Sequence, residues 1–170
     1  MLQRSRLRDS IGLRSPYSRM QIVVGADHRG YCLKDVIAGR LRAAGHDITD
    51  VGTNDGNSVD YPDLALAVGG AIQRGEAERG ILVCGSGVGA VIAANKLASI
   101  RAGLCHDTYS AHQGVEHDDM NLLCMGSRVI GEDLAMEIVH AFVAARFREE
   151  ERYRRRLEKV NKLEQGATTL

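Results

Sequence analysis

The stretch G-I-L-V-C-G-S-G-V-G, residues 80–89, joins an apolar run to a glycine-rich loop. Residues 80–84 contain no charged side chain, a pattern typical of a strand buried on both faces of a parallel sheet. Residues 88–97 follow with the composition of a helix. A buried strand, a tight glycine turn and a helix together predict one βα unit of an α/β fold.

Strand and helix patterns alternate in the same way along the rest of the chain. Apolar runs typical of strands occupy residues 21–26, 47–51, 80–84, 100–105 and 122–125. Helical patterns occupy residues 31–44, 61–74, 88–97, 108–115 and 132–147, and a charged helix follows to about Gln165. Because such alternation builds right-handed βαβ units, we predict a single-domain, three-layer α/β/α sandwich. Its Rossmann-like five-stranded parallel sheet would have the order 2-1-3-4-5, with an extra C-terminal helix.

The ends of the chain fall outside this pattern. Residues 20–165 would form the domain, and residues 166–170 a tail. Residues 1–19 hold five arginines and one acidic residue, a composition that a transit segment would share. A disordered extension before Met20, which could itself be the true start, is the simpler interpretation.

Charge and cysteine content exclude several classes of protein. The chain has 22 basic and 22 acidic residues and a formal net charge of zero, which argues against nucleic acid or a membrane surface as a partner. Its cysteines show no C-x-x-C spacing, so a zinc site or redox dithiol is not expected. They are Cys32, Cys84, Cys105 and Cys124. We interpret them as reduced thiols of a cytoplasmic protein.

The predicted topology places chemistry at one edge of the sheet. In a doubly wound sheet, ligands bind beyond the carboxyl ends of the strands at the switch point, here between the first and third strands. Asp27 and His28 follow the first strand, and Cys84 closes the third. The glycines at 85, 87 and 89 would expose backbone N–H groups to a phosphate or to an enediolate oxyanion. A helix start also favours a thiolate, so Cys84 could be a nucleophile or a general base.

Other interpretations of these residues remain open. Cys84 could be a buried strand cysteine beside a tight turn. Gly85-x-Gly87-x-x-Ala90, with Asp107 after the fourth strand, also fits a dinucleotide-binding fingerprint, although that motif normally follows the first strand. His117 could be a solvated loop histidine among carboxylates.

Three arginines are candidate phosphate ligands, because guanidinium binds phosphate in a bidentate manner. They are Arg128, Arg152 and Arg156. The last two share one face of the charged helix, at spacing i, i+4. That helix could be solvated or could pack on a second subunit.

Several motifs together carry a family resemblance. They occupy residues 25–30 with Lys34, 60–63, 80–89 with 93–96, 109–111, 116–121 and 126–131. From about Met20 to Gln165 the chain resembles the type B ribose-5-phosphate isomerases, a family that includes galactose-6-phosphate isomerases. Residues 1–19 have no recognisable counterpart.

The resemblance implies reversible aldose–ketose isomerisation of a sugar phosphate, foremost ribose 5-phosphate to ribulose 5-phosphate, with no metal and no cofactor. Cys84 would be the base that moves a proton between C2 and C1. Asp27 and His117 would open the sugar ring, with His117 as proton donor, and Ser86 would bind the sugar oxygens. The enediolate would be held by backbone amides of Gly85, Ser86, Gly87, Val88 and Gly89. The phosphate would be held by His28, Arg128, Arg152 and Arg156. Family members are homodimers or homotetramers with the active site at a subunit interface.

One position departs from the family pattern. Asp118 stands where many ribose-phosphate isomerases have asparagine, and an ionised carboxylate only accepts hydrogen bonds. The resemblance therefore leaves tetrose, pentose and hexose phosphates open as substrates. A sugar-phosphate sensor without catalysis is a further alternative, although a sensor would not need Cys84, Ser86, Asp27 and His117 together.

Overall fold

The computed structural model describes residues 19–169, so most of the predicted N-terminal extension and the last residue of the tail lie outside the described residues. Five strands form one parallel sheet: β1 (Gln21–Ala26), β2 (Asp47–Asp50), β3 (Arg79–Cys84), β4 (Ala102–Leu104) and β5 (Leu122–Gly126). The described helices are α1 (Tyr31–Ala43), α2 (Tyr61–Gln73), α3 (Val88–Ala94), α4 (Thr108–Asp118), α5 (Glu132–Ala144) and α6 (Glu151–Glu164).

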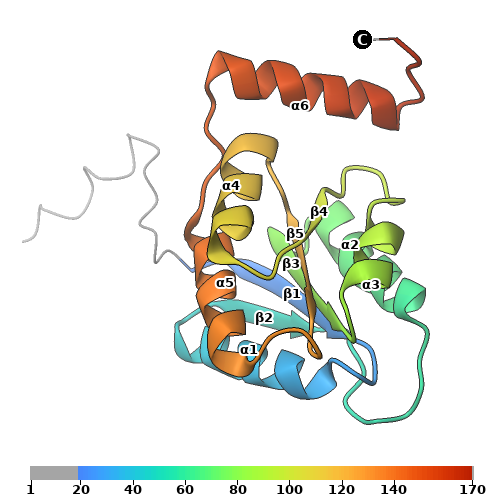
Figure 1. Ribbon diagram of the computed structural model, residues 1–170, viewed down its shortest axis with the longest axis vertical. Helices are drawn as coiled ribbons and strands as arrows, with labels where there is room; N and C mark the ends of the chain where they lie inside the picture. The colour runs from blue at the N-terminus through green and yellow to red at the C-terminus, as the bar shows by residue number, and fades with distance from the viewer. Residues whose placement is uncertain (1–18, 170) are drawn as a thin grey trace, which may run out of the picture.

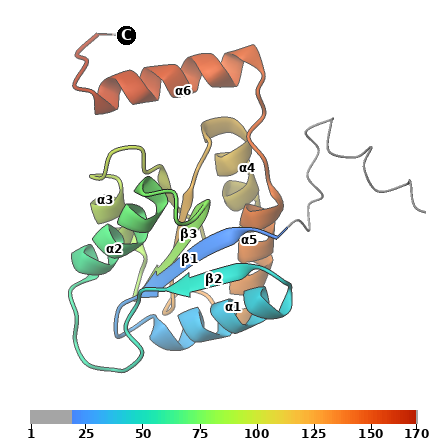
Figure 2. The same cartoon turned by 180° about the vertical axis from the view of Figure 1, so that it is seen from behind.

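The elements form the three layers that the sequence predicts. Helices α1, α4 and α5 cover one face of the sheet, and α2 and α3 cover the other (Figures 1 and 2). Two apolar clusters fill the spaces between the layers, one centred on Phe142 and Ile37 and the other on Val68 and Leu82. The predicted α/β/α sandwich with an added C-terminal helix is confirmed.

The predicted strand order is wrong at one end of the sheet. The observed order is β2-β1-β3-β5-β4, so β5 lies beside β3 and β4 forms the edge. Every residue of β5 is buried, which suits an interior strand, whereas β4 has three residues and its Leu104 is 37% exposed. Asn95 covers the free side of β4, since its amide exchanges hydrogen bonds with the backbone of Ala102 at 2.8 and 2.9 Å. A short strand shielded in this way belongs at a sheet edge.

Some elements are shorter or longer than the sequence predicts. Helix α3 ends at Ala94 because Asn95 turns to β4. Helix α5 ends at Ala144 rather than at residue 147, because two arginines bind its last carbonyls. Arg79 donates to the carbonyls of Phe142 and Ala145, and Arg146 donates to Val143 and Ala145. Helix α4 runs three residues further than expected, to Asp118.

The parallel strands all begin on one side of the sheet and end on the opposite side. We call the side where they end the carboxyl edge and the side where they begin the amino edge. Helix α4 starts after β4 at the carboxyl edge and returns to the amino edge, where β5 begins. Helix α6 lies across the amino edge, and β5 runs away from it toward the bottom of the view (Figure 1). The far end of α6 is tied to the loop before β4, because Glu164 accepts a hydrogen bond from the backbone N–H of Ser99 at 2.8 Å.

Candidate active site

Three loops meet at the carboxyl edge. The loop after β1 joins the end of β3 through Asp27 N–H and the Val83 carbonyl, 3.2 Å apart. The loop after β5 joins the loop after β3, because Ser127 N–H donates to the Cys84 carbonyl and Arg128 N–H to the Gly85 carbonyl. The predicted switch point between β1 and β3 therefore brings Asp27, His28 and Cys84 to one edge of the sheet.

Cys84 is the last residue of β3 at this edge and is only 5% exposed. Its Sγ accepts a hydrogen bond from Gly87 N–H at 3.1 Å. Gly87 has a φ of 81°, and a Cβ there would lie 3.0 Å from the backbone of Met125, so glycine alone fits the turn. The structure therefore fixes an N–H donor at the Cys84 sulfur, at the start of α3.

Asp27 is also buried and is fixed in one orientation. Its Oδ1 accepts hydrogen bonds from Arg29 N–H at 2.8 Å and Gly30 N–H at 3.1 Å. His28 is half-buried, and its Nδ1 accepts a hydrogen bond from Val59 N–H at 3.4 Å. Because a backbone N–H can only donate, neutral His28 carries its proton on Nε2 and can donate it to a ligand.

The glycine loop is lined by residues from other elements. Ser86 is exposed, and its Oγ accepts a hydrogen bond from Val88 N–H at 3.3 Å. A Cβ on Gly89 would lie 2.8 Å from the Tyr61 ring, so this aromatic side chain from the start of α2 packs against the loop. No role was predicted for Tyr61 from the sequence, although Tyr61 lies within one of the motifs that carry the family resemblance.

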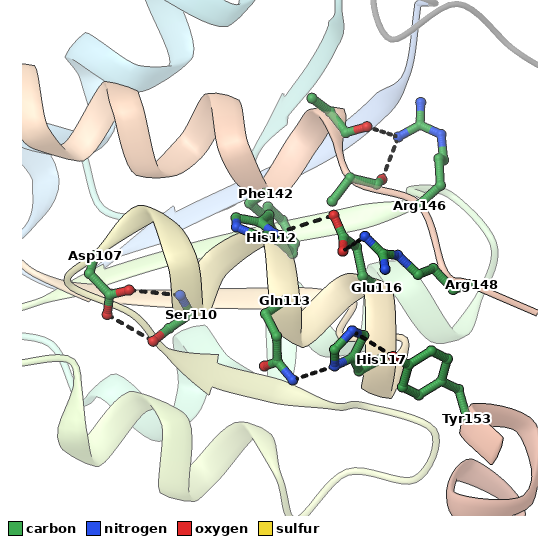
Figure 3. Close-up of polar contacts among 12 residues, drawn as sticks. Asp107, Ser110, His112, Gln113, Glu116, His117, Phe142, Arg146, Arg148 and Tyr153 are labelled. Carbon is green, nitrogen blue, oxygen red and sulfur yellow. Dashed lines mark hydrogen bonds and ion pairs between the residues drawn. The ribbon is translucent and has the colours of Figure 1, made fainter. Parts of the chain in front are cut away.

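A second cluster lies at the amino edge (Figure 3). His117 is half-buried in the last turn of α4, so it is not a solvated loop residue. Its Nδ1 lies 2.7 Å from Gln113 Nε2, and its Nε2 lies 3.0 Å from the Tyr153 hydroxyl. The His117 and Tyr153 rings stack with centroids 4.2 Å apart. Sequence reasoning missed Tyr153, whose signal was an aromatic residue inside a helix otherwise rich in charge.

The other predicted residues of the amino edge are exposed. Arg152 pairs with Glu150 at 3.0 Å and lies 4.5 Å above the Tyr153 ring. Arg156 and Asp118 are also exposed. Arg152 thus lies beside the Tyr153 ring that stacks on His117, and Asp118 directly follows His117 at the end of α4.

The structure does not bring the two clusters together within one chain. Cys84 lies where β3 ends, and His117 lies just before β5 begins, so the whole strand length separates them. At a rise of ~3.3 Å per residue, β5 spans roughly 15 Å. A site that uses both residues must draw them from different copies of the chain.

The remaining cysteines differ from Cys84 in their surroundings. Burial raises the pKa of Cys105 to about 11, and burial raises the pKa of Cys124 further. Both thiols therefore stay protonated near neutral pH. Cys32 is exposed on α1, and the four described cysteines are free.

Asp107, the acidic residue of the dinucleotide-binding interpretation, has a structural role. Asp107 caps α4, because its carboxylate accepts hydrogen bonds from Ser110 N–H at 2.7 Å and Ser110 Oγ at 2.8 Å. These bonds lower the pKa of Asp107 and occupy both carboxylate oxygens. The cap of α4 therefore accounts for an acidic residue at this position without a ribose ligand. None of the helices between residues 19 and 169 is long and apolar enough to span a membrane.

Comparison with known proteins decides the family. The family described as Ribose/Galactose Isomerase matches residues 22–160. The chain belongs to this family. It is 43% identical over 145 residues to ribose-5-phosphate isomerase B of Escherichia coli, covering 85% of this chain and 97% of that protein. It is 41% identical over 129 residues to D-erythrulose-4-phosphate isomerase of Pectobacterium atrosepticum, covering 75% and 85% of the two chains.

Solved structures agree with this assignment. The structure of ribose-5-phosphate isomerase B from Clostridium thermocellum matches with a TM-score of 0.84 and 44% identity, over 86% of this chain and 99% of that one. The type B ribose 5-phosphate isomerase of Trypanosoma brucei matches with a TM-score of 0.82 and 40% identity, over 86% and 99%. This member of the family is a sugar-phosphate isomerase that interconverts an aldose and a ketose.

Proposed function

We propose that this isomerase converts ribose 5-phosphate to ribulose 5-phosphate through a cis-enediolate, with Cys84 as the base and no metal. The observation that carries the proposal is the hydrogen bond from Gly87 N–H to the Cys84 sulfur. It supports a thiolate at the point where three loops meet. A cytoplasmic location belongs to the proposal, because the thiol must stay reduced to act as a base.

The proposed reaction begins with ring opening. His117 gives a proton to the ring oxygen while Asp27 takes the proton of the anomeric hydroxyl, so the sugar becomes an open-chain aldehyde. Two N–H groups already hold the Asp27 carboxylate in place. A carboxylate fixed in this way needs no reorganisation before it accepts a proton.

The isomerisation itself moves one proton between neighbouring carbons. The Cys84 thiolate takes the proton from C2, the C1 carbonyl oxygen becomes the enediolate oxyanion, and the Cys84 thiol then gives a proton to C1. Backbone N–H groups between Gly85 and Gly89 stabilise that oxyanion, and Ser86 exchanges the hydroxyl proton between the two oxygens. Such preorganised donors lower the barrier because they act where charge develops.

A second copy of the chain would complete the site. The edge strand β4 is short and partly exposed, and two copies related by a twofold axis beside β4 and perpendicular to it would run antiparallel. The carboxyl edge of each copy would then lie next to the amino edge of the other. Cys84 of one chain would meet His117, Arg152 and Arg156 of its partner, in a homodimer or a homotetramer built from such pairs.

The surface beside β4 suits this assembly. A cavity of about 820 Å³ lies between α6 and the β4 edge, lined by apolar residues that include Leu104, Leu157, Val160 and Leu163. Val160 and Leu163 are 48% and 52% exposed, and Ile92 on the neighbouring α3 is 58% exposed. An apolar groove continuous with exposed apolar residues is typical of a protein interface. The partner's α3 is the proposed occupant.

Two observations bear on the choice of sugar. The D-erythrulose-4-phosphate isomerase among the relatives shows that sequences this similar act on a tetrose phosphate. Asp118 is exposed beside His117 and would reach the sugar hydroxyls in the composite site. Ribose 5-phosphate remains the first expectation because the E. coli and C. thermocellum relatives carry that name.

The test is a substrate panel measured with chelator present. Purified enzyme is assayed with ribose 5-phosphate and with tetrose 4-phosphates and hexose 6-phosphates. We expect the largest kcat/KM for ribose 5-phosphate and no effect of the chelator. A larger kcat/KM for another sugar phosphate would contradict the pentose assignment, and complete loss of turnover with chelator would contradict the metal-free reaction.

A further inference from the structure

Arg29 lies beside the glycine loop at the carboxyl edge. Neither the sequence patterns nor the family resemblance assigned a role to this residue. A Cβ built on Gly85 would lie 3.0 Å from Arg29 Cδ and 3.9 Å from Arg128 Cδ. The stems of both arginines therefore flank the same glycine, the first residue after Cys84. Arg29 comes from the loop after β1, and Arg128 comes from the loop after β5.

The backbone of Arg29 is held at both of its polar groups. Its N–H donates to Asp27 Oδ1 at 2.8 Å, and its carbonyl accepts a hydrogen bond from Ser127 Oγ at 2.7 Å. Ser127 Oγ also lies 3.2 Å from the Cys84 carbonyl. The position of Arg29 is thus fixed relative to Cys84, although its side chain is exposed.

Neither guanidinium has an ion-pair or hydrogen-bond partner among residues 19–169. Two like charges beside one glycine repel each other unless an anion lies between them. Helix α1 begins at Tyr31, after its N-cap Gly30; its first turn contains no acidic residue, and no side chain caps its N–H groups. The two arginines and the start of α1 add positive potential at the carboxyl edge, where the Asp27 carboxylate, bound to the N–H groups of Arg29 and Gly30, is a negative group on the same loop.

We propose that Arg29 is a phosphate-binding residue of this enzyme, acting together with Arg128. A phosphate dianion fits the chemistry, because each guanidinium can offer two parallel N–H donors. The neighbouring His28 adds a further donor at Nε2, since its Nδ1 is occupied by Val59 N–H. This inference deepens the proposed function, because it assumes that the sugar phosphate binds at the carboxyl edge.

The role is one of binding and specificity rather than proton transfer. Arg29 holds charge next to Cys84 in the same chain, whereas Arg152 and Arg156 would come from a partner. The chain that supplies the base Cys84 would therefore also bind the phosphate. Loss of Arg29 should raise KM and leave kcat nearly unchanged, because the phosphate is equally charged in the ground state and the transition state.

The test compares Arg29→Gln with Arg42→Gln in the full-length enzyme. Arg42 is exposed near the end of α1, so its replacement makes the same charge change far from the carboxyl edge. Binding of inorganic phosphate is measured by calorimetry, and KM and kcat are measured with the best sugar phosphate of the panel. Circular dichroism and thermal unfolding check that each variant is folded.

We expect Arg29→Gln to raise the Kd for phosphate and the KM by about tenfold or more, as for one lost charge-assisted hydrogen bond. Arg29→Lys should recover part of the loss, and Arg42→Gln should stay within about twofold of the parent. A Kd for phosphate that is the same in Arg29→Gln and Arg42→Gln would overturn the inference. The phosphate measurement needs no turnover, so it separates this inference from the proposed isomerisation.

Discussion

Cys84 and His117 lie at opposite edges of one sheet. Cys84 ends β3 at the carboxyl edge, whereas His117 lies in the last turn of α4 at the amino edge. The proposed reaction needs both residues at one sugar, so the fold of a single chain argues for a site shared between copies. The exposed apolar groove between α6 and β4 provides a surface for that assembly.

Replacing Cys84 should stop the proton transfer and spare binding. In Cys84→Ala the thiolate that takes the C2 proton is missing, so exchange of that proton with solvent deuterium should fall by at least about a thousandfold. The Kd for inorganic phosphate should change little. The control is Cys32→Ala, because Cys32 is an exposed thiol on α1. Deuterium exchange by Cys84→Ala at more than a few per cent of the parent rate would exclude Cys84 as the base.

Gly87 should tolerate no side chain. Its φ of 81° is strained for alanine, and the added Cβ would meet Leu104 and the backbone of Met125. We expect Gly87→Ala to lower kcat by about a hundredfold, as for loss of an aligned N–H donor. Gly39→Ala is the matched control, because Gly39 lies on α1 with no atom within 4 Å of its Cβ position. Equal kcat values for the two variants would show that the turn at Gly87 is unimportant.

Tyr153 should hold the His117 ring in place. In Tyr153→Phe the stacked ring remains, but the hydroxyl 3.0 Å from Nε2 is lost. Tyr153→Ala removes both contacts and a buried anchor of α6. We expect kcat/KM to fall only a few-fold for the phenylalanine variant and by more than about tenfold for the alanine variant. Tyr109→Phe, at a 67% exposed position, should match the parent.

Tyr153→Ala and Tyr153→Phe should also differ in the strength of subunit association. Because α6 lines the groove beside β4, loss of its anchor should weaken subunit association. Sedimentation at several protein concentrations would measure this directly. Identical sedimentation and identical kcat/KM for Tyr153→Ala and the parent would contradict the role of this residue.

Asp118 should influence the choice of sugar. An asparagine at this position could donate as well as accept a hydrogen bond, whereas the carboxylate only accepts. We expect Asp118→Asn to raise the ratio of kcat/KM for ribose 5-phosphate to that for the tetrose phosphate by about fivefold to tenfold. Asp133→Asn changes an exposed carboxylate of α5 and should leave the ratio unchanged. An unchanged ratio in Asp118→Asn would mean that this side chain does not contact the sugar.

Much of the fold could be predicted because each element has a strong local pattern. The apolar run before Cys84 and the glycines after it predict β3, the turn and α3, and the switch-point rule places Asp27 beside them. The strand order could not be predicted, since it depends on pairing between distant segments. The complete burial of β5 and the short, partly exposed β4 decide it only once the sheet is assembled.

The amino-edge cluster was harder to predict for a similar reason. Spacing along the chain places Arg152 and Arg156 on one helix face, but it does not show where α6 lies. Only the tertiary structure brings Tyr153 against His117 and leaves Gln113 at the other ring nitrogen. Arg29 was missed although it directly follows His28, because nothing in the sequence shows that its side chain runs along Gly85.

The shared site can be tested most directly by mixing two inactive variants. Cys84→Ala and His117→Asn should each be inactive as pure preparations. After subunit exchange of an equal mixture, half of the dimers would be mixed, and each would contain one site with both residues intact. Activity should therefore return to about a quarter of the parent value. No recovery, in a mixture whose subunits are shown to exchange, would contradict a site built from Cys84 of one chain and His117 of another.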